Sequence, residues 1–110
     1  TVELKRWYCG MQTKLKIDLD WKPPHDWLQL YLDLIDIIVP NDGIIALLSS
    51  SGKGYHITVN LLEPVNDMHA CKLQFLLGDC RTRCRLNYAR IEAGIEGWNK
   101  FWRYKIKRPS

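Results

Sequence analysis

Long apolar runs are missing from this sequence of 110 residues. Its longest apolar stretches, Leu34–Val39 and Ile44–Leu48, are far shorter than the roughly 20 residues that a membrane-spanning helix needs. No secretory signal is recognisable where the sequence starts, so we expect an intracellular protein with no membrane partner. Repeats and low-complexity segments are also missing, which argues against a collagen-like chain, a coiled coil and a disordered chain.

The chain is too short for two independent hydrophobic cores, and we therefore expect residues 1–110 to form a single domain. It is 46% hydrophobic and 25% charged, which is ordinary for a globular protein. Five Trp, five Tyr and two Phe provide bulky side chains for a compact core.

Acidic residues are scarce in the second part of the chain. From Lys72 to Arg108 there are ten Lys and Arg against three acids, a balance of +7. From Thr1 to Ala70 there are six Lys and Arg against nine acids, a balance of −3. Such a polarity suits a protein that brings a metal ion and a polyanion together, and a solvated basic tail would give the same count.

The four cysteines lack the paired C-x2-C spacing of a zinc finger. A zinc set of His69, Cys71, Cys80 and Cys84 would have the unusual spacing C-x8-C-x3-C between its cysteines. Two disulfides would suit a secreted domain, but nothing else in the sequence points to secretion. We therefore expect buried thiols that are neither oxidised nor bound to metal.

Hydrophobic periodicity and turn residues predict a mixed order of strands and helices. The predicted strands are Val2–Cys9, Lys14–Asp20, Ile44–Leu48, Tyr55–Leu62 and Lys100–Arg108. One predicted helix begins at Pro23-Pro24, and a second spans Asn66–Leu77. The segment between Asp79 and Gly94 fits both a helix and a strand. This order predicts an α+β fold, in which helices cover one face of a mostly antiparallel sheet in the β-α-β-β-α-β order of ferredoxin-like and RRM-like domains.

The sequence predicts which residues are buried in two of these elements, the first helix and the strand Ile44–Leu48. The first helix has an apolar stripe of helical period that we expect to face the core, consisting of Trp27, Leu30, Tyr31, Leu34, Ile35 and Ile38. A turn over Pro40-Asn41-Asp42-Gly43 should follow this helix. The strand Ile44–Leu48 should then be buried on both faces, because it is apolar throughout.

Two aspartates lie one residue apart at the end of the predicted strand Lys14–Asp20. Residues i and i+2 of a strand project from the same face, so Asp18 and Asp20 should converge and attract a cation. Two carboxylates leave positions on Mg²⁺ or Mn²⁺ open for water and phosphates, as in nucleotide-polymerising sites. The solvent-exposed face of an amphipathic strand would give the same pattern.

The segment Ser49–His56 contains small residues and two glycines between two predicted strands. Its backbone N–H groups can approach an anion closely, and Lys53 and His56 can add charged donors. It is not a Walker A loop, because G-x-x-x-x-G-K-[ST] is absent and a strand follows it. The alternative is a flexible hairpin loop in front of a partly buried histidine.

Taken in order, these two motifs resemble those of the archaeo-eukaryotic primase superfamily, the primase-polymerases of archaea, eukaryotes, plasmids and viruses. Ile17–Asp20 matches the family's motif of a hydrophobic residue, Asp, a hydrophobic residue and Asp, and Ser51–His56 matches its motif S-G-x-G-x-H. The resemblance covers roughly Leu15 to Lys107. It implies an RRM-like catalytic unit of the kind carried by an archaeal virus or plasmid.

The resemblance also implies an activity, that of a metal-dependent nucleotidyltransferase that binds a nucleoside triphosphate and DNA or RNA. The implied catalytic residues are Asp18, Asp20 and His56, of which the two aspartates would bind Mg²⁺ or Mn²⁺. The implied triphosphate-binding residues are Ser51, Gly52, Lys53, Gly54 and His56.

The family's third motif, a hydrophobic residue followed by Asp, has two imperfect matches here. Asp79 in Leu77-Gly78-Asp79 follows a predicted helix, where it also suits a helix cap. Asn87 in Leu86-Asn87 would offer a metal only a neutral carbonyl oxygen. The alternative function is therefore a non-catalytic nucleic-acid-binding module on the same fold, with a degenerate third acidic motif.

Basic residues with interleaved aromatics form a further candidate site in the second part of the chain. Arginine binds phosphate in a bidentate manner, and aromatic rings can stack on bases. We expect nucleic-acid contacts from Arg81, Arg83, Arg85, Arg90, Arg103 and Lys105. The alternative is a solvated basic face above aromatic core residues.

Overall fold

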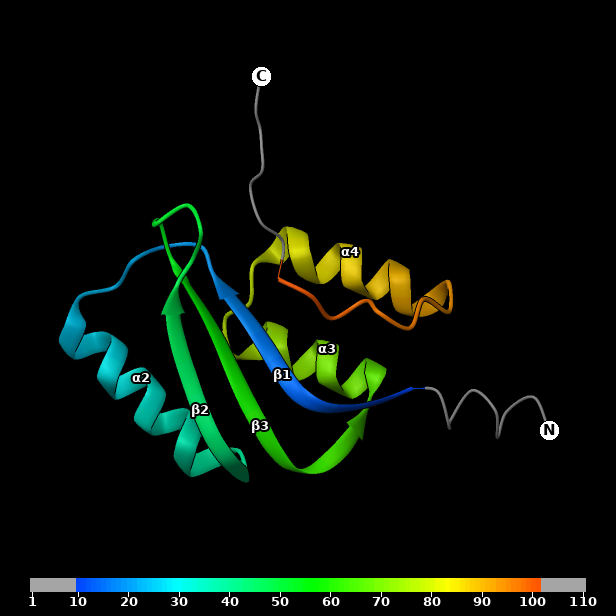
Figure 1. The fold of residues 1–110 in the computed structure, drawn as a ribbon, viewed down its shortest axis with the longest axis horizontal. Helices are drawn as coiled ribbons and strands as arrows, with labels where there is room; N and C mark the ends of the chain where they lie inside the picture. The colour runs from blue at the N-terminus through cyan, green and yellow to red at the C-terminus, as the bar shows by residue number, and fades with distance from the viewer. Residues whose placement is uncertain (1–9, 102–110) are drawn as a thin grey trace, which may run out of the picture.

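A computed structural model describes residues 10–101 of the chain (Figure 1). Its elements in chain order are β1 (Met11–Leu19), α2 (His25–Ile38), β2 (Asn41–Leu48), β3 (Tyr55–Asn66), α3 (Asp67–Leu76) and α4 (Arg81–Glu92). The α+β class predicted from the sequence is confirmed. The predicted strand Val2–Cys9 and nearly all of the predicted strand Lys100–Arg108 lie outside the described residues.

The three strands form one antiparallel sheet in the order β1-β3-β2. β3 is the central strand, and it pairs with β1 through Asp18 opposite His56 and with β2 through Leu47 opposite His56. Because both outer strands run antiparallel to β3, they run parallel to each other. They are therefore joined by a crossover connection, which contains α2.

The core lies on one face of this sheet. Along β1, Leu15, Ile17 and Leu19 are buried and alternate with polar residues, as a strand with one buried face requires. Ile57 and Val59 of β3 continue this apolar face. The helices add Leu28 and Ile35 from α2 and Ala70 and Cys71 from α3 to the same core cluster. Both helices therefore pack on one side of the sheet, and among residues 10–101 no helix covers its other face, which we call the open face.

The orientation predicted for the first helix is wrong for most of its stripe. Leu28 and Ile35 are the buried residues of α2, whereas Trp27, Leu30, Leu34 and Ile38 of the predicted stripe are exposed. The helix is apolar on two adjacent faces, and the sheet covers only one of them.

The prediction that Ile44–Leu48 is buried on both faces is also wrong. β2 is an edge strand, and its residues Ile45, Leu47 and Leu48 are exposed. The strand begins at Asn41, where a turn was expected. A turn-like feature is still present at the start of this strand, where the Asn41 side chain accepts a hydrogen bond from the Gly43 N–H. The pairing of β2 with β3 is irregular between Asn41 and Ile44.

The ambiguous segment between Asp79 and Gly94 is helical, and α4 packs against α3 rather than joining the sheet. Asn66 caps the N-terminus of the neighbouring helix α3, because its side chain accepts a hydrogen bond from the His69 N–H. α3 ends before Gly78, which has a φ of 103° that favours glycine. Among residues 10–101, no helix is long and apolar enough to cross a membrane.

Candidate functional site

The open face of the sheet carries the polar residues that alternate with the core residues. In the pairing of β1 with β3, Lys16 lies opposite Thr58 and Asp18 lies opposite His56. The Asp18 Oδ1 atom lies 3.6 Å from the His56 Nε2 atom, so the two side chains form an ion pair when the imidazole is protonated. The fold therefore brings together Asp18 and His56, two of the three residues that the resemblance implies are catalytic.

Burial acts on Asp18 more strongly than this ion pair does. Partial desolvation raises the pKa of Asp18, while the nearby His56 lowers it less, and the charges of Asp79 and Asp20 raise it further. Binding of a cation at Asp18 must therefore compete with a proton over a higher range of pH than at an exposed aspartate.

Phe101 stacks on His56, which sequence reasoning did not foresee. The two ring centroids are 4.1 Å apart and the ring planes differ by only 6°. The Arg83 guanidinium lies 5.1 Å and the Lys16 ammonium 6.0 Å from the centre of the Phe101 ring. The chain that follows α4 thus returns to the open face and adds an aromatic surface beside the Asp18–His56 pair.

Positive charge gathers around this aromatic pair. Burial lowers the pKa of Lys16, and the cations of Lys14, Arg83 and Lys100 lower it further. Since these cations come from β1, α4 and the segment after α4, the fold concentrates positive charge that is dispersed in the sequence.

The serine-glycine loop lies beside the end of β1. The Ser49 N–H donates to the Gly54 carbonyl, and the Ser49 and Ser51 hydroxyls accept from the backbone N–H groups of Gly54 and Lys53. A Cβ atom on Gly54 would lie 1.9 Å from the Leu19 carbonyl oxygen. Glycine at this position therefore allows the loop to pass directly against the strand that carries Asp18.

Replacing Gly54 by alanine should destabilise the protein by about 1–3 kcal/mol, because the added methyl group would force the loop away from Leu19. The measurement is the free energy of unfolding in urea. Lys53→Ala in the same loop is the control, since Lys53 is exposed and its loss should change stability by less than about 0.5 kcal/mol. Equal stability of the Gly54→Ala variant and the wild type would contradict this account of the close approach.

Asp20, Asp79 and Asn87 do not join Asp18 in one cluster. Asp20 follows the last residue of β1 and is exposed. Asp79 lies next to β1, but both of its oxygens are engaged, one by the Asp18 N–H and one by the Arg83 guanidinium. Asn87 is fully buried in α4, where its Oδ1 atom accepts from Arg90.

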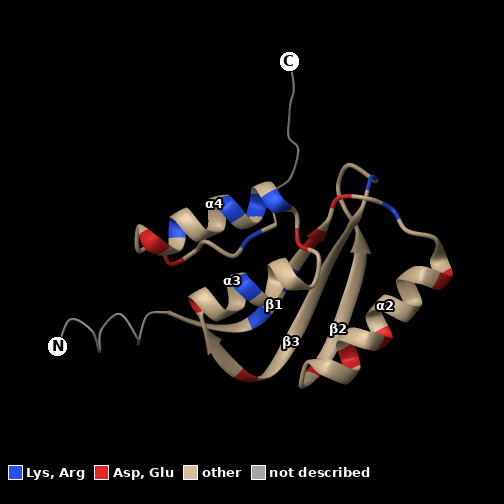
Figure 2. Cartoon of the chain, turned by 180° about the vertical axis from the view of Figure 1, so that it is seen from behind, with Lys and Arg blue, Asp and Glu red and all other residues tan. Residues whose placement is uncertain are grey.

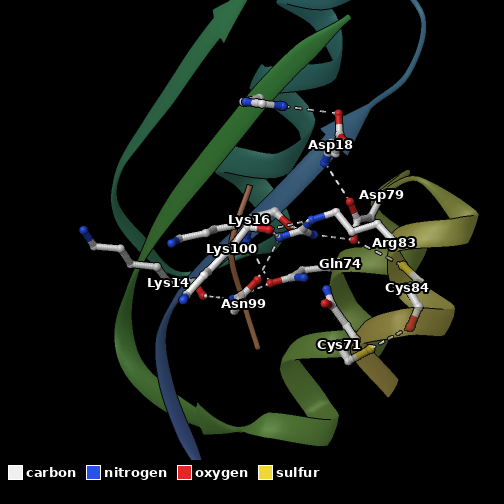
Figure 3. A network of polar contacts seen from close by, with 12 residues as sticks. Lys14, Lys16, Asp18, Cys71, Gln74, Asp79, Arg83, Cys84, Asn99 and Lys100 are labelled. Atoms are coloured by element: carbon white, nitrogen blue, oxygen red, sulfur yellow. Dashed lines mark hydrogen bonds and ion pairs between the residues drawn. The ribbon is translucent and has the colours of Figure 1, made fainter. Parts of the chain in front are cut away.

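Asp79 instead belongs to a polar network along the outer edge of β1, where the next strand of the sheet would pair (Figure 3). The Lys16 N–H donates to Gln74, and the Lys16 carbonyl accepts from Arg83. The Asp18 N–H donates to Asp79, and the Asp18 carbonyl accepts from the backbone N–H of Cys80. Side chains and a loop therefore satisfy the strand groups that a fourth strand would otherwise bond.

Arg83 is the centre of this network and is not exposed, contrary to the prediction that it contacts nucleic acid. It forms a 2.7 Å ion pair with Asp79, donates to the carbonyls of Lys16 and Lys100, and donates to the Asn99 side chain. The spacing of Asp79 and Arg83, four residues apart, is a signal in the sequence that would have indicated this pair.

The other predicted nucleic-acid residues that the structure describes all belong to α4. Arg81 and Arg85 line a groove between α3 and α4. Arg90 donates to Asn87. Arg103 and Lys105 lie outside the described residues.

The described part of the chain contains no group of three or more His, Cys, Asp or Glu side chains that could hold a metal ion. Asp18 and Asp20 belong to no such group within residues 10–101. The zinc set of His69, Cys71, Cys80 and Cys84 does not form either. Cys71 and Cys84 are buried thiols, as predicted, and burial raises the pKa of both. Cys80 is a half-buried thiol, and Cys9 lies outside the described residues.

Comparison with known proteins gives one similar protein and no family. No family model matches the chain, and no solved structure matches it. "Uncharacterized protein 30" of the Sulfolobus islandicus filamentous virus (isolate Iceland/Hveragerdi) is 28% identical over 99 residues, which cover 86% of this chain. The chain spans 37% of the length of that viral protein.

Proposed function

We propose that the open face of the sheet binds single-stranded nucleic acid, as an RRM-like module that resembles a primase core but lacks a complete metal site. The RRM-like assignment is supported by the order β1-α2-β2-β3-α3, by the sheet order β1-β3-β2 and by the packing of both helices on one face. The likeness to a viral protein supports the expected origin in a virus or plasmid.

The observation that carries this proposal is the stacked pair of His56 and Phe101 among the cations of the open face. RRM-like sheets and other single-strand binders place aromatic rings for base stacking beside basic groups that follow the phosphates. Lys14 and Lys16 lie on β1 next to the stack, and Lys100 directly precedes Phe101. Three cations and two rings therefore meet at one place, and one of these rings, His56, also pairs with Asp18.

Binding of a fluorescein-labelled single-stranded oligonucleotide, followed by fluorescence anisotropy in EDTA, tests this proposal. We expect binding without metal, with an affinity that falls steeply as the salt concentration rises. Phe101→Ala should weaken binding roughly 5- to 150-fold, the loss expected for one stacked base. The thermal midpoint of the variant, measured by circular dichroism, establishes that it is folded at the temperature of the assay.

The Lys14→Ala/Lys16→Ala variant tests the electrostatic part of the same proposal. Each lost phosphate contact should lower the slope of log K against log salt by about one. Lys22→Ala, in the exposed loop that leads to α2, is the control that removes one positive charge away from the stacked rings and should keep the slope. If Arg81→Ala or Arg85→Ala abolished binding while the β1 variant retained it, the interface would lie on α4 and the proposal would be wrong.

A second candidate, metal-dependent nucleotide binding of the primase-polymerase type, is favoured by the Asp18–His56 contact beside the serine-glycine loop. Here Asp18 and Asp20 would hold Mg²⁺ or Mn²⁺, while Ser51, Lys53 and His56 would hold the triphosphate. A bound metal would supply Lewis-acid activation of the α-phosphate. Because the described residues provide no third acidic ligand, we derive no reaction step from this site.

Titration of Mn²⁺ in the presence of a fluorescent nucleoside triphosphate separates the two candidates. The enzyme hypothesis requires saturable, metal-dependent nucleotide binding that is lost in Asp18→Asn. The substitution should leave the fold intact, because the bonds of residue 18 to Asp79 and Cys80 use its backbone. We expect no effect of metal in either protein, and metal-dependent binding by the wild type alone would favour the enzyme.

A further inference from the structure

A groove between α3 and α4 lies in the helical layer, on the side of the sheet opposite the open face. It has a volume of about 680 Å³. Its apolar surface comes from side chains such as Phe75, Leu76 and Tyr88, all of which are substantially exposed. These exposed apolar side chains line one groove and are not scattered singly over the surface, so the groove is a candidate binding site.

The edge of this groove is positively charged. Lys72, Arg81 and Arg85 line it, and no carboxylate is among its lining residues. The occupant should therefore combine apolar side chains with carboxylates. The lining residues of α4 span Arg81 to Tyr88, roughly 10 Å at 1.5 Å per residue, which is the length of two turns of a helix.

The outward face of α2 combines apolar side chains with carboxylates. Its outward stripe contains Leu30, Leu34 and Ile37, which are 59%, 50% and 77% exposed and have the i, i+4, i+7 spacing of a helix that inserts into a groove. Asp26 and Asp33 border the stripe, and the helix contains no Lys or Arg. Figure 2 shows the contrast between the acidic α2 and the basic α4 on two separate parts of the molecule.

We propose that the groove between α3 and α4 binds the outward face of α2 from a second copy of this chain. The two surfaces match in apolar character, in length and in charge. A contact between two α2 helices would instead place carboxylates against carboxylates, and would leave the cations of the groove without a partner. The interface is therefore heterologous, and it closes into a ring or extends as a chain according to the rotation between subunits.

Two variants that each damage one surface test this interface by sedimentation velocity. Leu34→Lys alters only the α2 face, and Arg85→Glu alters only the groove. The wild type should gain mass as its concentration rises, and each variant alone should remain at the monomer mass of 12.9 kDa. An equimolar mixture of the two should form a 1:1 complex, because one variant retains the groove and the other retains the α2 face.

Glu63→Lys, an exposed residue of β3 outside both surfaces, is the matched control and should associate as the wild type does. The proposal is overturned if the wild type stays monomeric at all concentrations. It is also overturned if Arg85→Glu forms the same dimer as the wild type, which would indicate a symmetric contact through α2 alone. Neither result bears on nucleic-acid binding, which uses the opposite side of the sheet.

Discussion

Replacing Arg83 by methionine should destabilise the protein by about 3–5 kcal/mol, the loss typical of a broken buried ion pair. Arg83 is only 3% exposed and its partner Asp79 only 5%. The substitution would leave the Asp79 carboxylate buried without its cation, and the carbonyls of Lys16 and Lys100 without their donor. Urea unfolding followed by circular dichroism measures the change, which is a large share of the stability of a domain of this size.

Two further variants distinguish two possible causes of this loss of stability: the unpaired Asp79 carboxylate that is left buried, and the loss of the arginine side chain itself. Arg85→Met makes the same chemical change at an exposed position of the same helix and should cost less than about 0.5 kcal/mol in dilute protein. The double variant Asp79→Asn/Arg83→Met should be more stable than Arg83→Met, because it removes the uncompensated carboxylate. A double variant less stable than the single one would show that the ion pair is not the main source of the effect.

Trp98→Ala should also destabilise the protein by about 3–5 kcal/mol, because it removes the largest fully buried side chain of the described residues. Trp98 belongs to the same core cluster as Leu15, Ile17 and Cys71. Its loss should also release the following segment, in which Asn99 donates to the Lys14 carbonyl and Phe101 stacks on His56. The readouts are the unfolding free energy and the affinity for the labelled oligonucleotide.

Trp98→Phe is the conservative comparison for this position. Phenylalanine keeps most of the apolar volume and removes an indole N–H that has no hydrogen-bond partner. The cost should therefore stay below about 1.5 kcal/mol, the usual limit for a hydrophobic exchange of similar volume. A similar loss of stability in both variants would contradict the assignment of Trp98 to the packed core.

Local sequence patterns predicted the type of most elements, because the alternation in β1 and the capping of α3 depend on neighbouring residues alone. They did not predict which face of α2 is covered. Leu30 and Leu34 have the same apolar character as Leu28 and Ile35, and only the position of the sheet distinguishes them. The error at β2 has the same origin, since its place at the edge of the sheet follows from the pairing of all three strands.

The sequence predicted the parts of the candidate site that local motifs mark. It did not predict the contacts that side chains from distant segments add to the site. Asp18, His56 and the serine-glycine loop stand together because two adjacent strands carry them. Phe101 is one of the aromatics interleaved with basic residues, but no local pattern shows that its ring stacks on His56, 45 positions before it. Asp79 suited a metal ligand in the sequence, whereas the fold places Arg83 against it.

The bonding of the outer edge of β1 has a consequence for synthesis on the ribosome. The groups that bond this strand, from Gln74 to Asn99, are translated more than fifty residues after it. While they are still missing, a nascent chain that has already paired β1 with β3 exposes a row of backbone donors and acceptors to other chains. Synthesis of α4 and of Asn99 ends that exposure, so the segment from Gln74 to Asn99 protects β1 from intermolecular aggregation.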